Sequence, residues 1–135
     1  MVFMMKGINE YKQVDTSASV QTATPHQLIA MLYRGVLESL ARAEGAMERK
    51  DIQARTQQIN KALEIIGNLR GTLDQEKGGE VAQSLETFYA AATAQLLAAN
   101  RYNDIERVQN LRKEFVDMAE AWSQIPVELH EMGAR

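Results

Sequence analysis

The two prolines of this chain, Pro25 and Pro126, enclose one hundred residues that contain no other proline. Because proline inside an α-helix costs about 3 kcal/mol, a long stretch without it is open to continuous helix. Residues that favour helices (Ala, Glu, Lys, Leu and Arg) make up 58 of the 135 positions. No stretch alternates apolar and polar residues as a half-buried strand does. The sequence therefore predicts an all-α protein.

Composition narrows the functional classes. The chain has no cysteine, which excludes a disulfide scaffold, a thiolate metal site and a cysteine nucleophile. A formal net charge of −3 argues against nucleic-acid binding, which needs a basic surface to neutralise phosphates. No apolar run approaches the roughly 20 residues of a membrane span, and no secretory signal pattern begins the chain. We therefore expect a cytoplasmic protein.

Capping residues divide the proline-free stretch into four helices. Thr24 is a predicted N-cap with Pro25 in the first helical position and Gln27 completing a capping box. Asp51 is the natural N-cap of a second helix, and Asn103 or Asp104 caps the fourth. The pair Gly78-Gly79 is expected to end the second helix. The predicted helices cover about residues 25–50, 52–77, 80–100 and 105–124.

Helices joined by such short links must be antiparallel neighbours. The predicted architecture is an antiparallel up-down four-helix bundle at 24–125. It follows an N-terminal arm at 1–23, which is rich in Ser and Thr towards its end, and it precedes a flexible tail at 126–135.

Each predicted helix carries an apolar stripe for the core, and the stripe of the first helix widens to about half of the helix circumference. The second stripe runs from Ile52 to Leu73, and the third begins at Val81. Ile65 and Leu97 lie to the side of these stripes. Isolated exposed apolar residues are common, but off-stripe residues on several helices also fit a surface that binds another chain. A substitution Ile65→Asp would then weaken partner binding and leave stability nearly intact.

Other residues of the second helix leave two interpretations open. Arg55 and Arg70 interrupt its apolar stripe. In one interpretation, the aliphatic part of each side chain lies on the edge of the core and the guanidinium is in solvent. In the other, the guanidinium anchors a bound peptide. Gly67 and Gly71, one turn apart, allow either close helix packing or a shallow surface groove.

The sequence lacks the constellations of an enzyme. Neither histidine has the Glu-x-x-His spacing of a di-iron bundle, and no Ser or Thr has a His partner at motif spacing. We expect no catalytic residues, no metal and no cofactor.

Several motifs resemble the flagellin-specific export chaperones, the FliS family. They are Gly7-Ile8-x-x-Tyr11-x-x-Val14, Thr24-Pro25-His26-Gln27-Leu28 and Leu73-Asp74-x-Glu76-Lys77-Gly78-Gly79-Glu80. The resemblance covers roughly residues 7–122. It departs at Phe88-Tyr89-Ala90-Ala91-Ala92, where the family commonly has Leu-Tyr-x-Tyr-Met.

The resemblance implies a cytosolic chaperone of the flagellar type III export system. Such a protein binds the disordered C-terminal segment of flagellin, prevents premature polymerisation and hands the complex to a membrane-bound export gate component. An anti-sigma factor is a further partner that the family allows, and a homodimer stays open. In the family the N-terminal arm folds over a pocket that the partner also uses, and Ile8 and Tyr11 are the matching positions here.

We therefore hypothesise that Ile8 and Tyr11 close a pocket shared with the partner, and that further contacts lie on the second and third helices. These further residues are Ile65, Leu69, Leu73 and Leu97, with Arg70 as a polar anchor. A non-catalytic dimerising adaptor is the alternative function, and a metal-dependent bundle enzyme is the third class.

Overall fold

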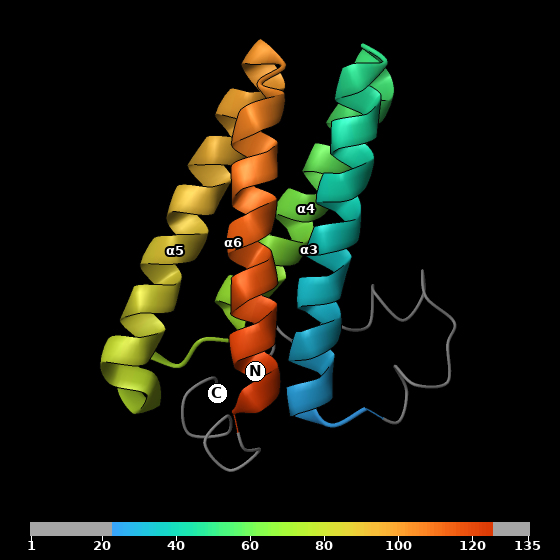
Figure 1. Ribbon diagram of the computed structural model, residues 1–135. Helices are drawn as coiled ribbons and strands as arrows, with labels where there is room; N and C mark the ends of the chain where they lie inside the picture. The colour runs from blue at the N-terminus through green and yellow to red at the C-terminus, as the bar shows by residue number, and fades with distance from the viewer. Residues whose placement is uncertain (1–22, 126–135) are drawn as a thin grey trace.

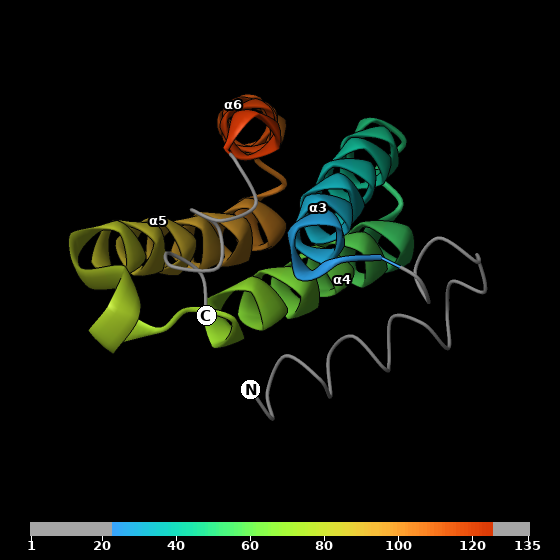
Figure 2. The same cartoon turned by 90° about the horizontal axis from the view of Figure 1, so that it is seen from below.

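The computed structural model describes residues 23–125, which form four helices. The helices are α3 (Pro25–Glu48), α4 (Ile52–Gly71), α5 (Gln75–Tyr102) and α6 (Ile105–Gln124). In Figure 1, α3 and α5 run in one direction and α4 and α6 in the other. Each helix packs against two neighbours, in the ring order α3, α4, α5, α6, and Figure 2 shows α3 and α5 on opposite sides of α6. The predicted antiparallel up-down bundle is confirmed. The predicted arm and tail lie outside the described residues, except for position 23.

Side-chain caps begin all four helices. Thr24 accepts a hydrogen bond from the amide of Gln27 at 3.1 Å, and the Gln27 side chain accepts one from the amide of Thr24 at 2.9 Å. This is the predicted capping box. The carboxylates of Asp51, Asp74 and Asp104 cap the other three helices. Because each cap satisfies amides that the first turn leaves unpaired, the caps fix where the helices start.

The corner between α4 and α5 differs from the prediction. The second helix ends at Gly71, where it was expected to continue to residue 77. The Thr72 hydroxyl donates to the Leu69 carbonyl at 2.7 Å, while Asp74 accepts from the amides of residues 76 and 77 and starts α5 early. Gly79 therefore does not end a helix but bends α5, with φ 50° and ψ −126°, a conformation open almost only to glycine.

The core forms around α3. Its predicted wide apolar face is buried, including Ile29, Leu32, Val36 and Leu40, and it packs with inward residues of the other three helices. Two residues placed in apolar stripes by the sequence are exposed instead, Ile52 at 64% and Val81 at 61%.

Both exposed residues stand near helix ends, where packing against neighbouring helices is incomplete. Ile52 is the first residue of α4. Val81 follows the bend at Gly79, where α5 diverges from α6 (Figure 1).

A polar contact crosses the centre of this apolar core. The hydroxyls of Tyr33 on α3 and Tyr89 on α5 lie 2.6 Å apart and are hydrogen-bonded. Both side chains are buried, and the Phe115 and Trp122 rings lie 6.3 Å from that of Tyr33. Burial raises the pKa of Tyr33 and, together with the neighbouring phenol, that of Tyr89. The pair therefore remains neutral above the pH at which an exposed tyrosine ionises.

We expect Tyr89→Phe to lower the free energy of unfolding by about 1–3 kcal/mol, because it leaves the Tyr33 hydroxyl buried and unpaired. The double variant Tyr33→Phe/Tyr89→Phe should lose less than the sum of the two single variants. Urea unfolding followed by circular dichroism measures all three, and simple additivity would contradict a paired buried contact.

The same variants test how the free energy of unfolding depends on pH. A folded-state pKa above the unfolded value of about 10 means that the stability contributed by the tyrosines is complete below that pH. It is lost as the pH rises further, so the wild-type protein should lose more stability above pH 10 than the double Phe variant.

Candidate functional site

Hydrogen bonds between α4 and α5 fix how these helices sit beside each other. The guanidinium of Arg55 donates to Asn100 at 2.8 Å and to Asn103 at 3.0 Å, and Thr56 lies 3.4 Å from the same Asn100 oxygen. Of the two interpretations of Arg55, the peptide anchor is thereby disfavoured, because its guanidinium already binds two amides within the chain. The contact ties the first turn of α4 to the last turn of α5.

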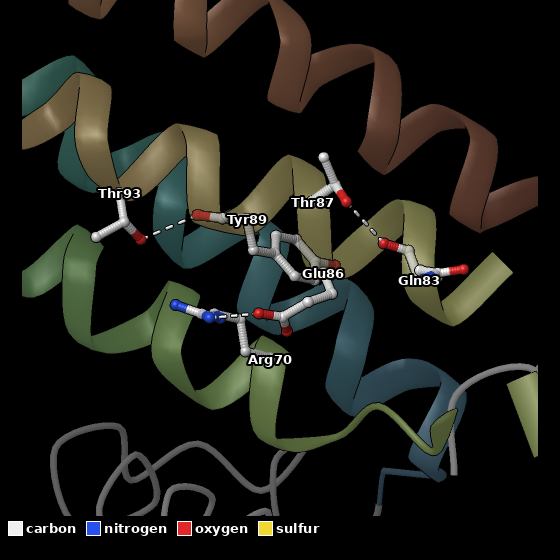
Figure 3. A network of polar contacts seen from close by, with 6 residues as sticks. All are labelled: Arg70, Gln83, Glu86, Thr87, Tyr89 and Thr93. Carbon is white, nitrogen blue, oxygen red and sulfur yellow. Dashed lines mark hydrogen bonds and ion pairs between the residues drawn. The ribbon is translucent and has the colours of Figure 1, made fainter. Parts of the chain in front are cut away.

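A second polar contact joins the C-terminal end of α4 to the middle part of α5. Arg70 on α4 donates to the carboxylate of Glu86 on α5, and Figure 3 shows the two side chains reaching towards each other between the helices. The side chains are 40% and 36% exposed, respectively. The hydrogen bond to Glu86 raises the pKa of the Arg70 guanidinium.

The two contacts enclose a surface seam between α4 and α5. Thr56 and Arg70 are fourteen residues apart on α4, as are Asn100 and Glu86 on α5, so the contacts agree on one antiparallel register. Residues spaced by three, four or seven positions from the contact residues lie on or beside the same helix face. Five of them define the α4/α5 seam: Leu63, Gly67, Ala90, Thr93 and Leu97. Leu63 and Thr93 are partly buried, and the other three are exposed.

A shallow pocket adjoins the seam on the outer side of α4. It is lined by Glu64, Gly67, Asn68, Arg70 and Gly71. A Cβ built on Gly67 would meet no atom within 4 Å. Gly67 is therefore not needed for close packing, and the surface-groove interpretation of the glycine pair is the one that fits.

The structure divides the predicted contact residues. Leu97 is 57% exposed, as its off-stripe position suggested. Ile65 is only 4% exposed and belongs to the core, so the expectation that it lies outside the core is wrong. Its angular position on the helix placed it beside the apolar stripe, but the neighbouring helices cover a face of α4 that is wide enough to bury it.

The remaining predicted residues also differ in their surroundings. Leu69 is buried, and Leu73 is partly buried against the core in the link after α4. Arg70 lies at the surface with Glu86. Ile8 and Tyr11 lie outside the described residues.

The opposite side of the bundle is closed by contacts between α3 and α6. Arg112 donates two hydrogen bonds to Glu44, whose side chain is only 10% exposed. The Trp122 indole donates to the His26 carbonyl at 3.1 Å, and the two rings stack with centroids 5.6 Å apart. His26 thus packs against α6 rather than serving as a solvent-exposed or capping residue.

Residues 23–125 hold no cluster of three acidic or histidine side chains that could bind a metal ion. Within the same range, no helix is long and apolar enough to cross a membrane. The chemistry that the described surface supports is recognition: an apolar seam with charged and amide groups at its ends. The class is thus a helical bundle that binds another chain.

Comparison with known proteins identifies the family. The model of the family described as "Flagellar protein FliS" matches residues 7–128. The flagellar secretion chaperone FliSB of Pseudomonas aeruginosa is 40% identical over 124 residues, covering 92% of this chain and 98% of the relative. FliS of Salmonella typhimurium is also 40% identical, over 125 residues, with 92% and 93% covered. Vibrio cholerae FliS is 32% identical over 131 residues, with 97% and 96% covered. The chain belongs to the FliS family of flagellar secretion chaperones, a non-catalytic family.

Sequence reasoning did not identify two seam features. Leu63 lies seven residues from both Thr56 and Arg70, so the sequence already places it on the same helix face as these two residues. The role of Glu86 depends on the register of α4 against α5, which no single-helix pattern specifies.

The burial difference between Ile65 and Leu97 is testable. Ile65→Asp places an unpaired carboxylate in the core and should lower the free energy of unfolding by at least about 3 kcal/mol. Leu97→Asp should change it by less than about 0.5 kcal/mol, because the side chain is already hydrated. Thermal unfolding measures both, and a stable Ile65→Asp variant would contradict its placement in the core.

Proposed function

We propose that this chain is a cytosolic export chaperone that binds the disordered C-terminal segment of flagellin. It prevents premature polymerisation and delivers its client to the flagellar type III export apparatus. The observation that carries the proposal is the exposed α4/α5 seam on a member of the FliS family. A long seam with apolar residues between polar ends suits an amphipathic helix that forms on binding.

The proposed client contacts fall into two groups. Leu97 and Arg70 are at the surface and contact the client directly, and the partly buried Leu73 lies in the link after α4. Ile65 and Leu69 are buried, so they support the client site from beneath. Ile8 and Tyr11 close a pocket shared with the client, on the strength of their match to the family motif.

Further partners follow from the same proposal. The loaded chaperone binds a component of the export gate, and an anti-sigma factor is a further partner that the family allows. A dimerising adaptor is the alternative function. Light scattering measures molar mass and so distinguishes the chaperone from the adaptor. The adaptor is a dimer in the absence of flagellin, and its mass does not increase when flagellin peptide is added.

The central test uses a synthetic peptide covering the C-terminal segment of flagellin from the same organism. Isothermal titration calorimetry should show saturable binding to the full chain. Leu97→Asp should weaken binding about tenfold, because a buried leucine contributes about 1.5–3 kcal/mol. Val116→Asp is the matched control, an exposed aliphatic residue on α6 that lies away from the seam, and its affinity should stay within twofold. Equal losses in both variants would contradict a client site on the seam.

The arm has its own test. Deletion of residues 1–14 removes both Ile8 and Tyr11 and should change the affinity for the same peptide and reduce the solubility of the free chaperone. Unchanged affinity together with unchanged solubility would exclude a shared pocket.

A further inference from the structure

The ion pair of Arg70 with Glu86 lies at the end of the seam nearest the C-terminus of α4. It engages the guanidinium that a client would use. Arg70 is the cation at the border between the α4/α5 seam and the adjoining pocket. In the structure its guanidinium binds Glu86, which stands on the same face of α5 as Leu97. Both side chains remain about two-fifths exposed, so a carboxylate from outside can approach the same guanidinium.

We propose that Glu86 is an intramolecular competitor of the client: it occupies Arg70 until an acidic side chain of the client replaces it. This proposal rests on the proposed function and adds a specificity rule and a regulatory contact to it. Exchange of one exposed carboxylate for another changes the free energy little, because exposed ion pairs are worth at most about 1 kcal/mol. The switch is therefore freely reversible.

The geometry also defines the client chemistry. Glu86 and Leu97 are eleven residues apart on α5, a rise of about 16 Å along a helix. A client helix lying along the seam would place an apolar residue against Leu97. Its carboxylate would stand about three turns away, next to Arg70. We therefore infer that the recognised segment carries an apolar and an acidic residue at a spacing of about eleven.

The experiment is a double-mutant cycle on the full chain with the flagellin peptide, measured by calorimetry at low and moderate salt. Glu86→Gln removes the competitor and should tighten binding about three- to fivefold at low salt, with a smaller gain at higher salt. Arg70→Gln should weaken binding by a similar factor. The double variant should match Arg70→Gln alone, because Glu86 acts only through that guanidinium.

The matched control is Glu114→Gln, which removes one exposed carboxylate from α6 and changes the net charge equally. Its affinity should stay within twofold of the wild-type value. If Glu86→Gln and Glu114→Gln tighten binding alike, or if Glu86→Gln acts in the Arg70→Gln background, bulk charge explains the effect and the competition is overturned.

A second readout does not need the client. Phenylglyoxal modifies accessible guanidinium groups, and peptide mapping should show faster modification of Arg70 in Glu86→Gln than in the wild-type chain. An unchanged rate overturns the ion pair as a competitor in solution. Failure of the wild-type chain to bind the peptide overturns the proposed function. Wild-type binding that Glu86→Gln leaves unchanged overturns only the competition.

Discussion

The hydroxyl pair of Tyr33 and Tyr89 is the constraint on which the placement of α5 depends. α3 and α5 lie on opposite sides of the bundle, yet these two side chains meet at 2.6 Å in its centre. A buried hydroxyl without a partner is costly, so α5 can neither rotate nor slide without breaking the contact. With Tyr89 directed inward, Glu86 and Leu97 are left on the side of α5 that borders α4. The core contact thus determines which residues form the seam.

Two kinds of contact hold the helices together. All four helices share one apolar core, to which α5 contributes Tyr89, Ala92, Leu96 and Ala99. In addition, polar contacts join α5 to α4, between Arg55 and Asn100 and between Arg70 and Glu86. These polar contacts leave the exposed residues between them free for another chain. A chaperone that must release its client benefits from such a surface, because exposed polar contacts can be exchanged at small cost.

The sequence was sufficient for those features that depend on local chemistry. The Thr24 capping box, the N-cap at Asp51 and the wide apolar face of α3 were predicted from residue type and spacing, and Asp104 was one of two candidates for the cap of α6. The sequence did not show which of two nearby signals would set the helix boundary. Gly78-Gly79 was expected to end a helix, but the cap at Asp74 begins the next helix before that pair. Ile65 and Glu86 show the other limit. Their surroundings are set by the packing of one helix against another, and a single-helix pattern contains no information about that register.

The length of the seam has a consequence for the state of the client. A helix that spans the eleven residues between Glu86 and Leu97 is about the length below which isolated helices are marginal in water. In the proposed complex, such a segment is helical on the chaperone and largely unfolded away from it, so the entropy lost on ordering offsets much of the contact energy. Release then returns the segment to an unfolded chain. An apolar contact near Leu97 and a charged contact at Arg70, about three turns apart, would together select a segment by its spacing, although neither contact binds tightly alone.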